Sequence, residues 1–232
     1  MHNNIITRRT FAIGAAAAAA AVAAPALRAQ PRVEKSKLAL AVGGKSAFYY
    51  LPLTISEQLG YFKDEGLDVE ISDFAGGAKA LQALMGSSAD VVSGAYEHTI
   101  NMQARNQFIQ EIVLMGRAPQ ISVGVSTKTM PGYKSLADLR GKKIGVSAPG
   151  SSTNMVADLL LTRAGVKPSD VSFVGIGTSA GAVAAVRAGQ VDAISNTDPI
   201  MTILEQKGEI KIISDTRTLK GTQEVFGGPM PA

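Results

Sequence analysis

The chain has 232 residues, 46% of them hydrophobic, so it is long enough to bury a core and has the composition of a globular protein. Its formal net charge is +4, but three of the positive charges, Arg8, Arg9 and Arg28, lie in an expected leader. Without them, 20 Lys and Arg stand against 19 Asp and Glu, so no nucleic-acid partner is expected. The sequence contains no cysteine, which excludes disulfide bonds, thiolate metal ligands, a lipid-anchored cysteine and a cysteine nucleophile.

The first 29 residues have the pattern of a cleaved export signal. Arg8 and Arg9 precede an apolar run over 11–24 that is mostly alanine, and Pro25 with the small residues up to Ala29 forms a candidate cleavage zone. A membrane-spanning helix needs roughly 20 apolar residues, so a membrane anchor is the less favoured interpretation, as is a buried alanine-rich helix. The paired arginines resemble a twin-arginine signal. We therefore predict a removable signal over 1–29.

After the leader, strand-like apolar runs alternate with helical patterns, which is the order of an α/β protein with parallel sheets. The first series predicts strands over 38–42, 67–71 and 90–93, helices over 52–60 and 78–85, and a third helix that begins near Tyr96. The second series predicts strands over 143–147, 171–174 and 191–195 and helices over 153–164, 180–188 and 199–206. Two further strands, over 121–126 and 210–214, bound the second series.

The two series resemble each other at an offset of 102 residues, which places Asp90 on Asp192 and Ser93 on Ser195. This match indicates two lobes of similar build, with generic α/β patterning as the alternative. The strands over 121–126 and 210–214 then form a two-strand hinge. We predict lobe 1 over 30–120, lobe 2 with the hinge strands over 121–214, and a short polar return segment to lobe 1 over 215–232.

Six loops follow the carboxyl ends of the predicted strands, where α/β proteins bind their ligands. Glycines and hydroxyl residues in these loops let a ligand approach the free N–H groups of helix starts, which favour anions. For each loop taken singly, ordinary helix capping is the favoured interpretation. The recurrence of the same residue types in most loops of both series indicates a cleft that binds a small polar ligand. The candidate residues are Lys45, Ser46, Gly76, Gly77, Tyr96, Glu97, Ser151, Ser152, Thr153, Thr178, Ser179, Asn196, Thr197 and Asp198.

Three other features are weaker signals. A G-x-G-x-x-A pattern over 175–180 follows the second strand of its lobe, whereas a dinucleotide fingerprint follows the first, so no nucleotide is expected. His98 is the only histidine outside the leader, so we expect a hydrogen-bonded helix residue and no metal site. Phe48, Tyr49 and Tyr50 either stack on a flat ligand or pack the first loop onto its lobe.

Four segments resemble one family of transport proteins. The stretch YLPLTISEQLGYFKDEGLDVE over 50–70 is similar to the first helix and second strand of the substrate-binding proteins of nitrate, sulfonate, taurine and thiamine-precursor ABC importers. FAGG over 74–77 resembles their ligand loop, LADLRGKKIGV over 136–146 the entry into their second lobe, and AGQVDAIS over 188–195 a late repeat element. The resemblance covers essentially all of the chain after the leader.

The resemblance implies a type II periplasmic-binding-protein fold, in which two lobes, each a parallel-type sheet with flanking helices, close on a ligand about the two-strand hinge. It implies a monomeric, cofactor-free, non-enzymatic protein of the periplasm that captures a small anion and delivers it to an ABC permease at the inner membrane. The anion would be of the sulfonate, nitrate, taurine or carboxylate type. The candidate loop residues above would line the cleft.

Two alternatives use the same scaffold. One is an enzyme similar to the thiamine-pyrimidine synthases, which use histidine and a cysteine-rich motif, and the absence of cysteine argues against it. The other is an extracytoplasmic ligand sensor. Members of the resembled family run considerably further, so we expect the chain to be truncated at its C-terminus. The first lobe would then lack part of its covering layer and would fold weakly or aggregate.

Overall fold

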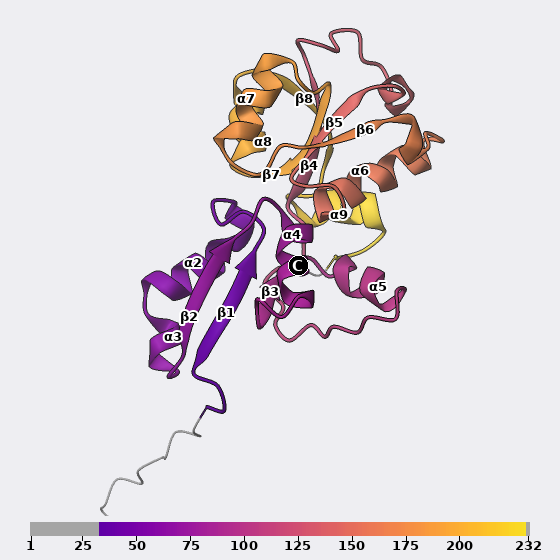
Figure 1. The fold of residues 1–232 in the computed structure, drawn as a ribbon. Coiled ribbons are helices and arrows are strands. Elements are labelled where there is room, and N and C mark those ends of the chain that lie inside the picture. Colours follow the sequence, from indigo (N-terminus) through magenta and orange to yellow (C-terminus); the bar gives the residue numbers. More distant parts are fainter. Residues whose placement is uncertain (1–32, 231–232) are drawn as a thin grey trace, which may run out of the picture. The chain divides into compact units, whose positions relative to one another are not determined.

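The computed structural model describes residues 33–230, so the expected signal over 1–29 lies outside the described residues. Lys35–Ala232 form one compact unit, which contains two separate β-sheets. Within residues 33–230, no helix combines the length and the apolar content that crossing a membrane requires. Figure 1 labels the helices and strands in chain order.

The first sheet has three parallel strands in the order β2-β1-β3, with Leu40 of β1 opposite both Ile71 of β2 and Val91 of β3. Because successive side chains of a strand point to opposite faces, β1 is covered on both sides. Ala41 packs with Ala80 of α4, whereas Leu40 packs with the cluster around Tyr50. The elements are β1 (Lys37–Val42), η1 (Phe48–Tyr50), α2 (Leu51–Gln58), α3 (Tyr61–Asp64), β2 (Asp68–Asp73), α4 (Gly77–Met85), β3 (Val91–Ser93) and α5 (Glu97–Gln103).

The second sheet has five strands in the order β6-β5-β7-β4-β8, and its core strands β6, β5 and β7 are parallel. The strands β4 and β8 are antiparallel to each other, and β4 is also antiparallel to β7. The elements are β4 (Ile121–Ser126), η2 (Leu136–Leu139), β5 (Lys143–Val146), α6 (Ser152–Arg163), η3 (Pro168–Asp170), β6 (Ser172–Gly175), α7 (Ala180–Ala188), β7 (Ala193–Thr197), α8 (Ile200–Gln206), β8 (Ile210–Asp215) and α9 (Leu219–Phe226).

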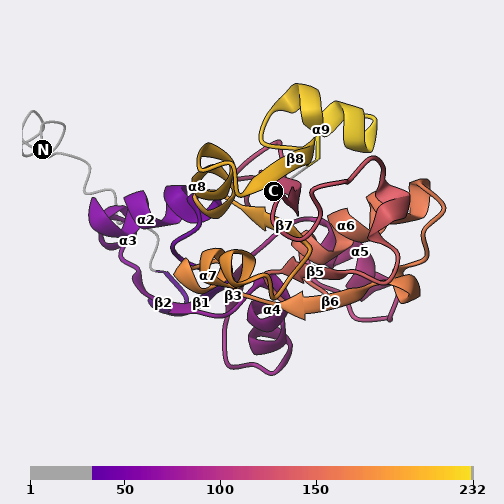
Figure 2. The same ribbon diagram turned by 90° about the horizontal axis from the view of Figure 1, so that it is seen from above.

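The second sheet has a hydrophobic core on each face, and two neighbouring residues of β7 pack into different cores. Ala193 belongs to the cluster that contains Leu161 of α6, and Ile194 belongs to the cluster that contains Met201 of α8. The views in Figures 1 and 2 agree that α7 and α8 lie on one face of this sheet and α6 on the other. The prediction of an α/β protein with two parallel-rich sheets is therefore confirmed.

The chain after β8 differs from the polar tail that the sequence predicted, because it forms the helix α9. Its start is capped by the Thr218 hydroxyl, which accepts a hydrogen bond from the Gly221 N–H over 3.1 Å. It ends at Gly227, whose φ of +80° is the left-handed conformation that commonly stops helices. Phe226 packs against a cluster that contains Ile121 and Val123 of β4. The assignment of 215–232 as a return segment to lobe 1 stays a prediction.

Candidate ligand-binding site

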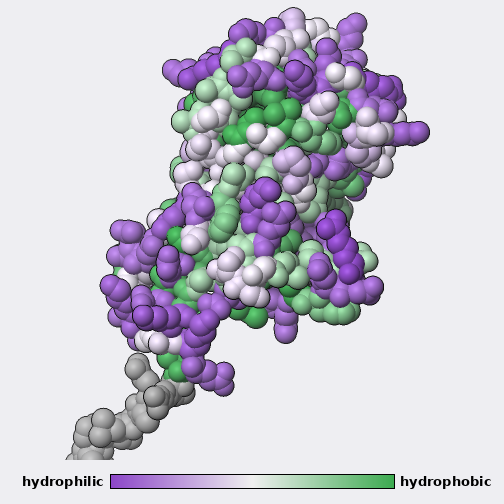
Figure 3. Space-filling view, in the orientation of Figure 1, coloured by the Kyte–Doolittle hydropathy of each residue, from purple (hydrophilic) through white to green (hydrophobic). Residues whose placement is uncertain are grey.

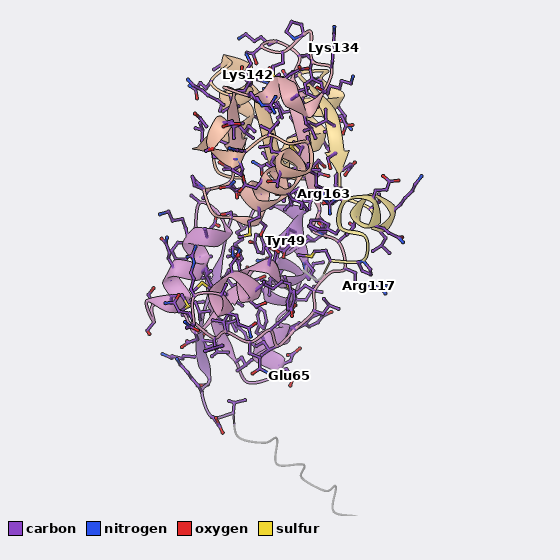
Figure 4. All side chains as sticks on the ribbon, turned by 90° about the vertical axis from the view of Figure 1, so that its right-hand side faces the viewer. Tyr49, Glu65, Arg117, Lys134, Lys142 and Arg163 are labelled. Carbon is purple, nitrogen blue, oxygen red and sulfur yellow. The ribbon has the colours of Figure 1, made fainter. Side chains whose placement is uncertain are left out.

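A cavity of about 40 Å³ lies where loops of the first sheet meet loops of the second. Its wall carries glycines, hydroxyl side chains and two tyrosines, and none of its lining residues has a charged side chain. The lining residues are Gly43, Ala47, Tyr49, Tyr50, Gly77, Gly94, Ala95, Pro119, Ile121, Ser147, Ser151, Ser152, Thr153, Thr178 and Thr197. We call residues 37–120 the first sheet region and residues 121–226 the second sheet region. Figure 4 labels Tyr49, which lies on the part of the first sheet region nearest the second.

Two helices begin in the cavity wall. Gly77 is the first residue of α4 and Ser152 the first of α6, and both line the cavity. Gly76 precedes α4 and Ser151 precedes α6, and neither residue makes a side-chain hydrogen bond to the first turn of the helix that follows it. Since the first N–H groups of a helix lack partners within the helix and carry its positive dipole end, this wall favours a negatively charged or strongly accepting group.

Gly43 allows the loop after β1 to press against the start of α4. A Cβ atom on Gly43 would lie 2.2 Å from the Gly77 nitrogen, closer than any real contact, so only glycine fits. The Gly43 N–H donates to the Tyr50 hydroxyl over 3.1 Å. Burial raises the pKa of Tyr50 to about 12, so this side chain is an uncharged phenol at neutral pH.

Three hydrogen bonds join loops of the two sheet regions beside the cavity. The Ala78 N–H, in the first turn of α4, donates to the Ser151 hydroxyl over 2.9 Å. The Ser46 hydroxyl donates to the Thr178 carbonyl over 3.2 Å, and the Phe48 N–H donates to the Asp198 carbonyl over 3.0 Å. Ser151 therefore caps a helix of the other region, a role that the sequence did not indicate.

The predicted site residues fall into three groups. Those that line the cavity come from four of the six predicted loops, although the structure places Thr197 at the end of β7: Gly77, Ser151, Ser152, Thr153, Thr178 and Thr197. Ser46 and Ser179, again with Thr178, line a second cavity of about 750 Å³ beside α7 and α8. The remaining residues have other surroundings, and their role as ligand contacts stays a prediction.

Several of these remaining residues are engaged within the protein. The Lys45 ammonium pairs with Glu57 over 2.7 Å, and the Asn196 amide donates to the Gly177 carbonyl over 2.9 Å. Asp198 accepts hydrogen bonds from the Thr202 N–H and hydroxyl at the start of α8. Asp198 also lies 3.6 Å from the Arg217 guanidinium.

Three more predicted residues sit at helix starts outside the lining. Gly76 precedes α4, and a Cβ on it would lie 3.0 Å from the Ser151 hydroxyl. Tyr96 and Glu97 begin α5, where Tyr96 is exposed. None of these three residues is among the residues that line the cavity.

Other lining residues were not among the candidates. Tyr49 and Tyr50 come from η1, and the sequence left open whether they face a ligand or pack the loop. Ser147 directly follows β5 and shares a 2.8 Å hydrogen bond with the Thr153 hydroxyl. Ile121 comes from β4, whose position beside the first sheet depends on the packing of the whole chain. Tyr49 and Tyr50 carried a sequence signal as aromatic residues beside a predicted loop, and Ser147 carried one as a hydroxyl residue at the end of a predicted strand.

His98 differs from the expected hydrogen-bonded helix histidine, because its Nε2 is buried and has no hydrogen-bond partner among residues 33–230. Burial lowers the pKa of the imidazole, and the neighbouring Glu97 carboxylate raises it. Since burial is the larger effect, His98 is neutral at physiological pH. Within the same residues, no group of three or more His, Asp or Glu side chains is placed to hold a metal ion.

Residues 47–218 match the family described as NMT1/THI5 like. A binding protein of Brucella abortus is 32% identical over 157 residues, which are 66% of this chain and 45% of that protein. A protein of Escherichia coli K12 described as binding aliphatic sulfonates is 27% identical over 198 residues, covering 85% of this chain and 61% of that protein. The chain thus spans about half the length of the curated relatives it matches.

A solved structure from Bordetella bronchiseptica RB50 is 65% identical and superposes with a TM-score of 0.84, covering 85% of this chain and 62% of that chain. The alkanesulfonate-binding protein of Xanthomonas axonopodis pv. citri, solved with MOPS bound, is 24% identical, with a TM-score of 0.65 over 85% of this chain and 65% of that chain. This second likeness concerns the fold alone and identifies it as that of the type II periplasmic binding proteins. The family match covers well over half of the sequence, and the chain belongs to the NMT1/THI5-like family.

Proposed function

We propose that this chain is the solute-binding component of an ABC importer, which captures a small anion and delivers it to a membrane permease. The observation that carries this proposal is the cavity between loops of two α/β sheet regions, with helix starts and hydroxyl groups in its wall. Such a wall binds an anion without covalent chemistry. The solute class that fits is a sulfonate, nitrate, taurine or carboxylate.

The names of relatives support the transport role. The Escherichia coli relative is described as a sulfonate-binding protein, and the Brucella relative as a binding protein. Binding would act through conformation, because a ligand that touches loops of both sheet regions favours the arrangement in which those loops meet. The hinge would be formed by β4 and β8, and the lobes by 30–120 and 121–214.

The location and assembly belong to the same proposal. The leader over 1–29 would direct the chain across the inner membrane by the twin-arginine route and be removed, and the mature protein would act as a monomer in the periplasm. Its partners would be the solute and the permease. Mass spectrometry of the protein purified from a periplasmic extract tests this, because a retained leader or a cytoplasmic location would contradict it.

An enzyme on the same fold is the competing function. A yeast relative, 26% identical over 129 residues, is named a pyrimidine phosphate synthase. The cysteine-rich motif of that enzyme class has no counterpart in a chain without cysteine. A sensor of the same ligand differs from an importer component only in its partner, which a pull-down with the permease would identify.

Isothermal titration of the full chain with nitrate, ethanesulfonate, taurine and acetate tests the binding proposal. We expect one of these anions to bind and to be recovered unchanged. The Ser152→Ala variant should weaken binding by about ten-fold, because it removes a hydroxyl from the cavity wall. Ser56→Ala is the matched control, since that hydroxyl bonds the Pro52 carbonyl on the exposed helix α2. Conversion of a ligand, or failure of all four to bind, would contradict the proposal.

A further inference from the structure

Six buried side-chain oxygen or nitrogen atoms have no hydrogen-bond partner among residues 33–230. Such atoms are rare in folded proteins, because the desolvation of a buried polar atom is then offset by no hydrogen bond. Two of them, Tyr49 OH and Thr197 Oγ1, belong to residues that line the 40 Å³ cavity. A third is Nε2 of His98, and the other three lie on Thr129, Asp158 and Ser214, which do not line it.

The His98 imidazole borders the same cavity. Its Nε2 lies 3.1 Å from the position that a Cβ would take on Gly77, and its Cδ2 lies 3.5 Å from that position on Gly94. Both glycines line the cavity. The imidazole is therefore packed behind the wall at the start of α4, where two residues without side chains leave it closest to the cavity.

Four other polar side chains of the wall, those of Tyr50, Ser147, Ser151 and Thr153, are already engaged within the protein. Ser147 and Thr153 bond each other, and Thr153 also accepts from the Ser147 N–H over 3.0 Å. The Ser151 hydroxyl accepts from Ala78, and the Tyr50 hydroxyl accepts from Gly43. The wall thus contains polar groups that hold the protein together and, beside them, buried polar atoms that have no hydrogen-bond partner among residues 33–230.

We infer that Tyr49, His98 and Thr197 hold the polar head of the ligand, and that this head is a small oxyanion bound through uncharged donors. The inference rests on the proposed function and names which residues perform it. A nitrate or sulfonate group has several acceptor oxygens, which one phenol, one hydroxyl and one imidazole N–H can share. Among residues 33–230 no cationic side chain lines the cavity, so the positive end of α4, which begins at Gly77, supplies the remaining stabilisation.

The protonation states agree with this role. Burial raises the pKa of the Tyr49 phenol well above its usual range, with smaller contributions from Tyr50 and the Glu97 and Glu111 carboxylates. Tyr49 therefore keeps its proton and donates it to an acceptor. The imidazole of His98 is neutral and has one N–H, which can be placed on Nε2 toward an anion.

The test measures ligand affinity and stability together in Tyr49→Phe, His98→Gln and Thr197→Val. Each variant should weaken the binding of nitrate or ethanesulfonate about ten-fold or more, because a hydrogen bond to the anion is lost. Each should leave the thermal midpoint of the ligand-free protein unchanged or raised, because an unpartnered buried polar atom is removed or changed. Thr197→Ser, which keeps the hydroxyl, should restore the affinity.

Two controls separate this role from simple packing. Thr153→Val breaks the engaged pair with Ser147 and should lower the thermal midpoint. Ser214→Ala removes an unpartnered hydroxyl outside the cavity and should leave the affinity unchanged. Ethanesulfonamide, the uncharged analogue, should bind at least ten-fold more weakly than ethanesulfonate, and equal binding would overturn the oxyanion assignment.

The outcomes also separate the two proposals. If the wild-type chain binds an anion and all three variants bind it equally well, this inference fails while the proposed function stands. If the three variants lose stability in the ligand-free state as Thr153→Val does, the atoms are structural and the inference fails. If the wild-type chain binds none of the anions, the proposed function itself fails.

Discussion

Asp90 in the first sheet region and Asp192 in the second occupy equivalent places. The Asp90 N–H donates to the Ala39 carbonyl over 2.8 Å, and its carboxylate accepts the Ala39 N–H over 3.0 Å. Asp192 makes the same two bonds with Lys143, at 2.8 Å and 3.0 Å. In both regions the aspartate thus ties the start of one parallel strand to its neighbour. The offset of 102 residues between the two series reflects this shared geometry.

The two regions bury their apolar residues very differently. Of the twelve largest almost fully buried side chains among residues 33–230, eleven lie in the second region and only Val42 lies in the first. Of the large hydrophobic residues that are exposed, twelve lie between Phe48 and Leu114, and two, Ile203 and Leu219, lie in the second region. Figure 3 shows green surface on both parts, and the contrast lies in the exposed fractions of these side chains. Similar topology therefore does not bring similar stability, and we expect the first region to open first.

The largest effect should come from truncating a core side chain of the second region. Leu161→Ala empties a site in α6 that is 1% exposed, and such substitutions cost about 2–5 kcal/mol. Leu40→Ala, in β1 of the first region, should cost an amount near the lower end of that range, because its smaller cluster can collapse around the gap. Urea denaturation of both variants checks the difference. An equal loss of unfolding free energy would remove the contrast between the regions.

The next effect concerns the place where the regions meet. Gly44→Ala would put a Cβ 1.8 Å from the Thr178 hydroxyl oxygen of the second region, at a φ of +112°. Gly60→Ala has a similar backbone requirement, with a φ of +80°, but its Cβ would meet nothing within 4 Å. Both should lose about 1–2 kcal/mol to backbone strain. Only Gly44→Ala should also weaken anion binding in titrations, and equal affinities would show that the approach of Gly44 to Thr178 is not needed for binding.

A smaller and pH-dependent effect is expected from Asp90→Asn. The hydrogen bond from Lys35, followed by that from the Ala39 N–H, lowers the pKa of Asp90 in the folded protein. A lowered folded pKa gives stability that is present above the unfolded pKa and is lost as the pH falls through the folded value. The difference in thermal midpoint between the wild type and Asp90→Asn should therefore shrink as the pH falls from about 5 to about 2. A difference that stays constant over this range would rule out the carboxylate charge as its source.

Local patterns predicted the elements of both regions well. The strand over 121–126 and the helix over 180–188 have the bounds that the sequence predicted, because alternating and helical apolar periods are unbroken there. The helix α9 was missed although Thr218 and Gly227 carry its start and stop signals, because its apolar face is short. Its burial depends on Phe226 reaching β4, a contact between residues about a hundred positions apart in the chain.

The cavity could be predicted only in outline. Topology places the loops after parallel strands at one edge, and Gly77, Ser152 and Thr178 of these loops line the cavity, while their role as ligand contacts stays a prediction. Topology does not predict which polar side chains form hydrogen bonds or ion pairs within the protein. Lys45 meets Glu57 on the following helix, whereas the His98 Nε2 meets no partner among residues 33–230. Both outcomes are decided by three-dimensional packing, which no local pattern records.

The smallest effect on stability should come from the exposed apolar loop of the first region. Ile112 is 73% exposed in the segment between α5 and β4, so Ile112→Lys should change the unfolding free energy by less than about 0.5 kcal/mol. It should nevertheless reduce aggregation, because it places a charge within the run of exposed apolar residues that includes Phe108 and Leu114. Light scattering at increasing protein concentration measures this effect.

Leu219→Lys is the matched control, since Leu219 is 53% exposed at the start of α9 in the second region and the substitution adds the same charge. If solubility depended only on net charge, both variants would aggregate less to the same extent. If the loop between α5 and β4 is the surface that associates, only Ile112→Lys should delay aggregation. The two variants therefore decide whether the unequal burial of the two regions, and not the overall charge, limits the solubility of this chain.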